Sequence, residues 1–281
     1  MLGTRIITAI VLLAILLPAL FAGSPWPFAA VTLVLIGAGA WEWGRLNGMT
    51  QPGAVLMGLA LAGLCLFTLQ GPGLAALPAG LWWAVGGAWV LGGAQALRLG
   101  PTGWPRLPRV GRLVLGFVLL WTAWAAMAMA RSLGLNFILS VFCLVWVADI
   151  FAYFGGRTLG RRKLAPAISP GKSWEGVWTG MAAVLLLALA WTWGIEPRLH
   201  TDGPGLYARL LTGLGLPLGL LALVFLCAMS VVGDLFESLV KRAVGAKDSS
   251  QLLPGHGGVL DRVDALLPVF PLALALNSLV P

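Results

Sequence analysis

The sequence has few charged residues. Charged side chains make up only 10% of its 281 residues, whereas 59% of the residues are hydrophobic and the mean hydropathy is +0.92. A soluble domain of this length could not bury so much apolar surface, because a large part of any globule faces water. The short alternating segments of a transmembrane barrel are also absent. The composition therefore predicts a helical membrane protein.

Cysteine and histidine are scarce. The three cysteines, Cys65, Cys143 and Cys227, lie within apolar segments and none is spaced as a metal-binding pair. We expect them to be small packing residues. His200 and His256 are the only histidines, and no cysteine is near either of them. A zinc site needs several nitrogen or sulfur ligands, so the sequence does not favour zinc and leaves carboxylates as the possible metal ligands.

Long uncharged segments make up most of the chain. No Asp, Glu, Lys or Arg occurs in residues 6–41, 46–97, 113–130, 132–148, 176–195, 210–233 and 265–281. Because a bilayer core takes roughly 20 apolar residues per helix, these segments predict about nine spans. We place them at residues 4–22, 26–41, 54–70, 78–97, 111–130, 134–154, 174–194, 209–232 and 265–280. The first segment also fits a signal peptide, but the spans that follow directly favour a retained helix.

The predicted fold is thus all-α and polytopic, with about five spans in residues 1–132. With nine spans, every Lys and Arg falls in loops on the N-terminal side except Arg131, Arg198 and Arg209. The positive-inside rule then places the N-terminus in the cytoplasm and the C-terminus outside. The net charge of +8 is explained by this topology and by anionic lipid headgroups. Nucleic-acid binding is not favoured, because membrane spans flank the basic residues.

Residues 133–281 carry most of the candidate chemistry. Asp149 lies late in the sixth predicted span, and an acid at membrane depth usually serves a function. A structural ion pair with Arg157 is the alternative. The loop that follows, residues 156–176, is rich in glycine and in basic side chains, and its prolines disfavour a helix. Ser173 is expected to cap the next helix, whose N-terminus would suit a phosphate group.

A second charged segment, residues 233–264, lies on the same predicted side of the membrane as loop 156–176. Only one helical hairpin separates the two segments, so we expect them to build one site at the cytoplasmic face. Asp234 closes the eighth predicted span, and Asp261 and Asp264 open the ninth, three residues apart and on one helix face. Converging carboxylates without thiolates suit a hard cation such as Mg²⁺.

Basic residues accompany these acids, and together they are typical of phosphoryl or nucleotidyl transfer. The alternative for each acid is an ion pair with its neighbour, Asp248 with Lys247 or Asp261 with Arg262. His256 could act as a base, as a phosphate donor or only as a turn residue. The glycines around it, including Gly257 and Gly258, indicate that the backbone comes close to another group.

The polar residues of both segments resemble those of the phosphatidate cytidylyltransferases, also called CDP-diacylglycerol synthases. The signature reads Ser238-x-x-Lys241-Arg242, Lys247-Asp248, Pro254-x-His256-Gly257-Gly258 and Asp261-Arg262-x-Asp264. A second block runs from Asp149 to Gly176 and includes Lys163-Leu164-Ala165-Pro166 and Lys172-Ser173-Trp174-Glu175-Gly176. Ile150 and Phe151 depart from the usual pattern. The detailed resemblance covers residues 149–264.

This resemblance implies a reaction in which CTP and phosphatidic acid give CDP-diacylglycerol and pyrophosphate, with Mg²⁺ as one or two cations. It also implies a homodimer in the bacterial inner membrane. The candidate catalytic residues are Asp234, Asp261, Asp264, Lys241 and His256, and the three aspartates are the candidate metal ligands, with Asp149 as an additional candidate. The candidate substrate-binding residues are Arg157, Lys163, Lys172, Ser173, Lys241, Arg242, Lys247, Asp248, Gly257, Gly258 and Arg262.

Two other functions are compatible with the same residues. A related lipid cytidylyltransferase or a CTP-dependent lipid kinase could act on an isoprenoid or ether lipid. An ion-coupled transporter would use Asp149 and the loop acids as coupling groups. Transporters usually place such groups at mid-membrane between two related repeats, whereas these charges cluster at one surface and have no counterpart in the N-terminal half.

Overall fold

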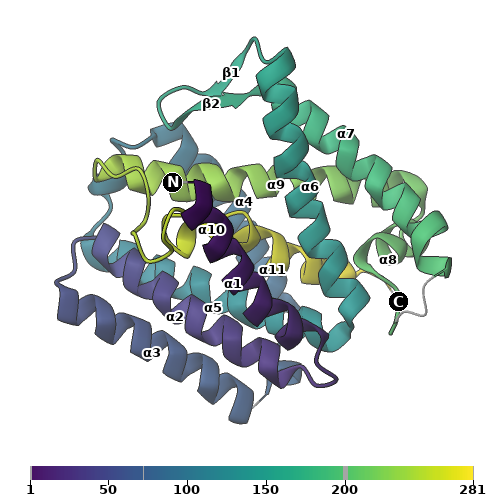
Figure 1. Cartoon of the computed structure of the whole chain (residues 1–281), viewed down its shortest axis with the longest axis horizontal. Coiled ribbons are helices and arrows are strands. Elements are labelled where there is room, and N and C mark those ends of the chain that lie inside the picture. Colours follow the sequence, from purple (N-terminus) through teal and green to yellow (C-terminus); the bar gives the residue numbers. More distant parts are fainter. Residues whose placement is uncertain (1, 72, 199–201, 281) are drawn as a thin grey trace.

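The computed structural model describes residues 2–71, 73–198 and 202–280, and these residues form a bundle of α-helices (Figure 1). The all-α fold class is therefore confirmed. His200, one of the two histidines, and the side chain of Arg5 lie outside the described part of the chain. The longer helices are α1 (Leu2–Phe21), α2 (Trp26–Leu46), α3 (Gln51–Gln70), α4 (Ala79–Leu99), α5 (Arg109–Leu133), α6 (Leu135–Leu159), α7 (Trp174–Ala190) and α9 (Leu216–Ala243). The shorter helices are α8 (Leu206–Gly213), α10 (Leu260–Val263) and α11 (Leu266–Asn277).

Six helices in the described residues are long and apolar enough to cross a membrane. They are α2, α3, α5, α6, α9 and α7, the last continued by irregular turns to Arg198. The predicted count of nine spans is not confirmed. The three cysteines are free, and Cys65 and Cys227 are buried, as expected of packing residues.

The predicted span at residues 209–232 has the wrong limits. Gly215 has a φ of +79°, a conformation that glycine adopts without strain, and it separates α8 from α9. Pro217 lies in the first turn of α9, where a missing N–H costs nothing. The helix then continues to Ala243, so that Asp234 lies within it rather than at its end.

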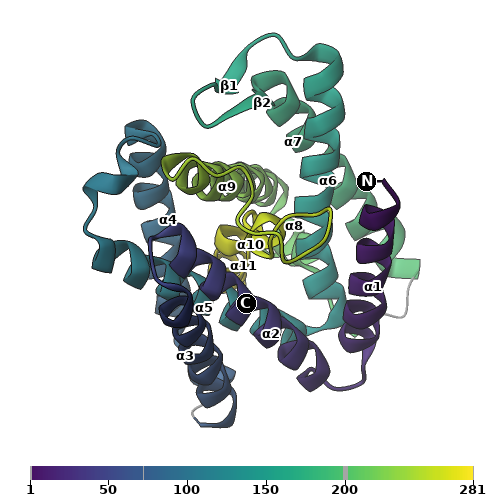
Figure 2. The same cartoon turned by 60° about the vertical axis from the view of Figure 1, so that its left-hand side comes forward.

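The last predicted span is also shorter than expected. Helix α11 has 12 residues, which extend about 18 Å at about 1.5 Å per residue, too little for a bilayer core of about 30 Å. Ten of its residues, from Leu266 to Ala275, are buried. The apolar residues of α11 therefore face other helices, and Figure 2 shows α9 and α11 in the middle of the bundle.

The segment between α9 and α11 turns back into the bundle. Gly233 lies ten residues before the end of α9, about 15 Å along the helix axis. A Cβ atom at Gly233 would lie only 2.5 Å from the carbonyl oxygen of Asp264. The junction of α10 and α11 therefore packs against α9 well below its C-terminal end, and α11 starts from that depth.

Loop 156–176 contains a short β-hairpin that the sequence did not predict. Strand β1 (Lys163–Ala165) pairs antiparallel with β2 (Ser169–Ser173), with Lys163 opposite Ser173. Ser173 caps α7 as predicted, because its hydroxyl accepts a hydrogen bond from the Gly176 N–H at 3.2 Å. The hairpin places Lys172 just before the first turn of α7.

The basic loops meet at one end of the bundle. Arg109 and Arg112, which begin α5, reach the turn after α2 through Gly48 and Asn47. At the opposite end, Arg131 donates to the carbonyl oxygens of Leu20 and Ala22. Helix α2 therefore runs opposite to α5, and these arginines lie at two different ends of the molecule.

Candidate active site

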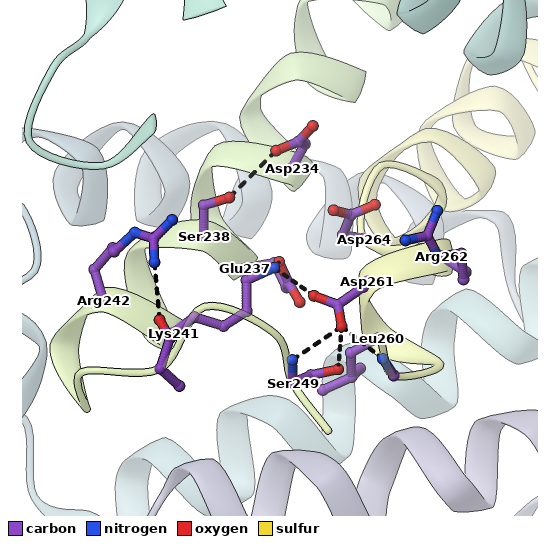
Figure 3. Close-up of polar contacts among 12 residues, drawn as sticks. Asp234, Glu237, Ser238, Lys241, Arg242, Ser249, Leu260, Asp261, Arg262 and Asp264 are labelled. Carbon is purple, nitrogen blue, oxygen red and sulfur yellow. Dashed lines mark hydrogen bonds and ion pairs between the residues drawn. The ribbon is translucent and has the colours of Figure 1, made fainter. Parts of the chain in front are cut away.

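The centre of the candidate site is one face of α9. Glu237 and Ser238 follow Asp234 by three and four residues, and Lys241 follows them by four and three, so the four side chains share one side of the helix (Figure 3). Glu237 is 1% exposed and Lys241 is 7% exposed. Charged groups are almost never buried to this degree unless they are paired. Glu237 and Lys241 are partners of each other, and α10 supplies a second partner for Lys241.

Lys241 joins α9 to α10. Its Nζ lies 2.5 Å from Oε2 of Glu237 and 2.5 Å from Oδ1 of Asp261. One ammonium group therefore forms ion pairs with two buried carboxylates from different elements. In this geometry Lys241 links α9 to α10 through its two ion pairs. A contact of Lys241 with a substrate phosphate stays a prediction.

Asp261 accepts hydrogen bonds on both oxygens. Besides Lys241, its carboxylate accepts from the Gly258 N–H at 2.7 Å, the Ser249 N–H at 2.9 Å and the Ser249 hydroxyl at 2.8 Å. Burial alone would raise the pKa of Asp261, but these bonds outweigh it and the pKa lies below its ordinary value. Asp261 is thus an ionised group that organises the segment before it.

Asp264 and Asp234 form the other side of the centre, nearer to the hairpin. Burial raises the pKa of Asp264 to about 8, and the negative charge of Asp234 adds to this shift. Lys172 reaches Asp234 from the hairpin, with Nζ 2.5 Å from Oδ2. Asp149 on α6 is close enough to interact electrostatically with both Lys172 and Asp234. The two charged segments therefore meet, as the sequence predicted.

The predicted metal ligands are not preassembled. Among the described residues, no group of three or more His, Cys, Asp or Glu side chains is close enough to hold a metal ion. The donor set nevertheless fits a hard cation. Five carboxylates share the region with two lysines, and Oε1 of buried Glu237 has no hydrogen-bond partner among the described residues. The crowding of carboxylates, which contributes to the raised pKa of Asp264, and the free oxygen atom of Glu237 suit a cation that binds oxygen.

The remaining candidate residues lie around this centre rather than in it. Arg242 donates to the carbonyl oxygens of Ile168 and Ala246, which ties the end of α9 to the hairpin. Arg157 donates to the hydroxyl of Tyr153, and Lys163 is exposed on β1. Arg262 donates to the carbonyl oxygen of His256. In the described structure, no ion pair joins Asp248 to Lys247, Asp261 to Arg262 or Asp149 to Arg157, so the purely structural pairings considered from the sequence are not formed.

Two of the cavities that adjoin the site differ in polarity. A polar cavity of about 660 Å³ lies at the charged segment and is lined by, among others, Lys247, Asp248, His256, Gly257 and Arg262. Nδ1 of His256 is buried without a hydrogen-bond partner in the described residues. An apolar cavity of about 560 Å³ lies between α4, the hairpin, α7 and α9. Trp174 and Leu235 line this second cavity, next in sequence to Ser173 and Asp234.

Comparison with known proteins decides which family this site belongs to. The model of the cytidylyltransferase family matches residues 3–280. The chain belongs to this family. It is accordingly a nucleotidyltransferase enzyme, as the signature residues predicted.

Three relatives illustrate the match, and each is named phosphatidate cytidylyltransferase. The protein of Pseudomonas aeruginosa is 41% identical over 282 residues, which cover 98% of this chain and 97% of the relative. The protein of Haemophilus influenzae is 36% identical over 294 residues, with 96% of each chain covered. The protein of Brucella melitensis is 39% identical over 276 residues, covering 95% of this chain and 89% of the relative. The resemblance therefore extends to the N-terminal half of this cytidylyltransferase.

Two acidic residues of the site were missed from the sequence. Glu237 lies in a membrane-crossing helix, and the reasoning that selected Asp149 as a costly intramembrane acid applies equally to it. Glu42 directly follows the uncharged segment 6–41, and its carboxylate reaches the charged segment more than 200 residues later. The sequence therefore contained a signal for Glu237, whereas the contact of Glu42 with the charged segment is visible only in the folded structure.

Proposed function

We propose that this cytidylyltransferase transfers the cytidylyl group of CTP to phosphatidic acid, forming CDP-diacylglycerol and releasing pyrophosphate. The observation that carries this proposal is the group of Asp234, Glu237, Asp261 and Asp264, here called the acidic centre. It is recessed in an apolar bundle between a polar and an apolar cavity. Such a centre can receive one substrate from water and the other from the bilayer. The names of the relatives support the same pair of substrates.

The polar cavity is the proposed place for CTP. It combines the cations Lys247 and Arg262 with His256, whose Nδ1 is free to bond a ligand. Cations that bond phosphate oxygens form charge-assisted hydrogen bonds, which are stronger than bonds between neutral groups. Asp248 on the same wall is available for the cytidine or ribose groups.

The apolar cavity is the proposed place for an acyl chain of phosphatidic acid. Its lining is apolar except for Arg98 and backbone groups, and it includes Trp174 and Leu235, which are near in sequence to Lys172 and Asp234. A lipid with its chain in this cavity would place its anionic headgroup beside Lys172. Arg98 on the rim would add a second positive charge.

The proposed reaction needs no nucleophilic side chain. An oxygen of the phosphatidate phosphate attacks the α-phosphorus of CTP and forms the new P–O bond. The bond from the α-phosphorus to the bridging oxygen breaks, and pyrophosphate leaves with its electron pair. Enzymes of this kind act chiefly by positioning the groups and neutralising charge, and Lys172, Arg242, Lys247 and Arg262 supply the positive charge here.

Mg²⁺ is the proposed cation of the acidic centre. Asp234, Asp264 and Glu237 have oxygen atoms available to hold it, and Asp261 remains a candidate although its carboxylate already accepts several hydrogen bonds. When bound, Mg²⁺ would polarise phosphate oxygens and stabilise the charge that develops on them. The protein residues orient both substrates around this position.

We also propose that the protein is a homodimer in the bacterial inner membrane, with the site facing the cytoplasm. The bacterial relatives and the apolar helices support a membrane protein. The basic loops gathered at the site end of the bundle support a cytoplasmic orientation of that end.

Product analysis tests the proposed reaction. Purified protein in detergent is given phosphatidic acid and CTP labelled in its α-phosphate. We expect the label in CDP-diacylglycerol, together with one pyrophosphate for each lipid. A lipid kinase would instead release labelled CDP and leave the lipid unlabelled, and that result would refute cytidylyl transfer.

Filling the apolar cavity should weaken lipid binding alone. Ala228 lines the cavity about two turns before Asp234 on α9, so Ala228→Trp should raise the KM for long-chain phosphatidic acid about tenfold. The KM for CTP should not change. Leu221→Trp, at a position 63% exposed on the same helix, is the matched control. Equal KM values for both variants would place the acyl chain elsewhere.

A further inference from the structure

Glu42 is a completely buried carboxylate in the N-terminal half of the chain. It lies near the end of α2 and is 0% exposed. None of the ion pairs in the described structure involves it. Burying an ionised carboxylate is costly unless hydrogen bonds satisfy its oxygens, so its bonding partners indicate what it does.

Within the described residues, the hydrogen-bond donors to the Glu42 carboxylate all come from the charged segment. Oε1 accepts from the Ser250 hydroxyl at 2.6 Å and from the Val259 N–H at 2.9 Å. Oε2 accepts from the Leu260 N–H at 2.8 Å and lies 3.2 Å from the Ser249 hydroxyl. One side chain of α2 therefore holds both ends of the loop that runs from Ser249 to Leu260.

Glu42 and Asp261 divide the donors of this loop between them. The Gly258 N–H donates to Asp261, whereas the next two N–H groups, of Val259 and Leu260, donate to Glu42. The Ser249 hydroxyl has a single proton, and it is closer to Asp261, at 2.8 Å, than to Glu42. The direction of each consecutive N–H group is thus fixed by one of two carboxylates.

The lack of space for a side chain at Gly258 shows how closely the loop packs against Glu42. A Cβ atom at Gly258 would lie 2.4 Å from Oε1 of Glu42 and 2.0 Å from Oγ of Ser249. Only glycine can therefore occupy this position without moving the carboxylate. The close backbone approach that the glycines indicated is, at Gly258, an approach to Glu42.

We propose that Glu42 is a positioning residue of this enzyme. It acts through the loop: by fixing the N–H groups of Val259 and Leu260, it sets the start of α10 and the position of Asp261 against Lys241. The same bonds shape the wall of the polar cavity, which Ser250, His256 and Gly257 line. The activity readouts of this proposal rest on the proposed cytidylyl transfer, whereas its structural readout does not.

The test is Glu42→Gln in the full-length protein. Glutamine has the same shape but only one acceptor oxygen, so one of the two backbone N–H groups would face the amide nitrogen. Because a displacement of about 1 Å at a reacting centre can cost about 100-fold in rate, we expect kcat to fall by about that factor. The KM for CTP should rise, while the KM for phosphatidic acid should stay the same. Glu42→Asp, which keeps the charge but is one methylene shorter, should recover part of kcat.

Glu196→Gln is the matched control. Glu196 also accepts a backbone N–H, that of Gly205, but at the other end of the molecule. We expect this control to keep the kcat of the unaltered enzyme. Should Glu42→Gln fail to fold, Ser250→Ala removes one donor and leaves the carboxylate bonded to the backbone. It should lower kcat by about threefold and raise the KM for CTP.

Hydrogen exchange provides the readout that does not depend on activity. The amides of Val259 and Leu260 should exchange faster in Glu42→Gln than in the unaltered protein, with no change in Glu196→Gln. Unchanged exchange at these amides would overturn the proposal. A lower melting temperature with kcat unchanged in the folded fraction would also overturn it. If the unaltered protein formed no CDP-diacylglycerol, the proposed function would fail, but the exchange measurement would still decide the role of Glu42.

Discussion

Asp234→Asn is expected to lower the rate of CDP-diacylglycerol formation by ~1,000-fold while the protein still inserts into the membrane. Asp234 interacts with Lys172 of the hairpin, with Asp149 on α6 and with Asp264 after α10, so it lies where the elements of the site meet. Losing a ligand of a catalytic cation removes several kcal/mol of transition-state stabilisation, and each 1.36 kcal/mol is a factor of ten in rate. Steady-state rates of purified protein measure this effect.

Asp202→Asn is the control for this substitution. Asp202 is also an aspartate that accepts hydrogen bonds on both oxygens, but its donors are the backbone N–H groups of Leu135 and Asn136 at the opposite end of the bundle. It should keep nearly the full rate. If Asp234→Asn loses less than tenfold, the acidic centre does not hold the catalytic cation through Asp234.

Lys241→Met is expected to reduce both stability and activity. The Lys241 ammonium is the shared partner of Glu237 and Asp261, so its removal leaves two buried carboxylates without a counter-charge. Breaking a buried pair by removing one partner costs about 3–5 kcal/mol. Thermal unfolding in detergent should show a lower melting temperature, and the rate of the folded fraction should fall because Asp261 loses its position.

A second substitution distinguishes this explanation from a general packing defect. In Lys241→Met, the buried carboxylates of Glu237 and Asp261 lack a counter-charge. Adding Glu237→Gln removes one of these two charges, so the double variant should be more stable than Lys241→Met alone. The two effects are coupled because the residues are in contact. A double variant less stable than either single variant would show that the charges of Glu237 and Lys241 do not compensate each other in the folded protein.

Local sequence signals predicted several features of the site correctly. Ser173 caps α7 because the hydroxyl of a serine before a helix can accept a hydrogen bond from a free N–H group of its first turn. Topology predicted that the two charged segments meet, since only one hairpin of helices separates them, and the contact between Lys172 and Asp234 confirms it. The family signature also predicted that Lys241, Asp261 and Asp264 belong to one site.

Other features could not be read from hydropathy. An apolar segment that faces lipid and one that faces protein have the same composition, so α11 was predicted as a full span although it is a short, buried helix. The depth of Asp264 follows from how the preceding segment turns back against Gly233, and no local pattern encodes that turn. The hairpin of loop 156–176 also has only three and five residues in its strands, too few for a clear alternation.

The roles of individual residues in the acidic centre could likewise be assigned only from the three-dimensional structure. The signature treats Lys241 as one more basic residue, yet its burial assigns it to two carboxylates. Glu42 belongs to the half of the chain where the sequence indicated little chemistry, and its partners are 207 to 218 residues away. The N-terminal helices therefore contribute to the geometry of the site as well as to membrane insertion.

The dependence of the rate on Mg²⁺ tests the proposed role of the acidic centre most directly. Purified enzyme is freed of divalent cations with a chelator and assayed with CTP and phosphatidic acid while Mg²⁺ is added back. We predict no CDP-diacylglycerol above background without the cation, and a rate that rises and saturates as Mg²⁺ is restored. A full rate in the chelated enzyme would contradict the assignment of Asp234, Glu237 and Asp264 to a catalytic cation site.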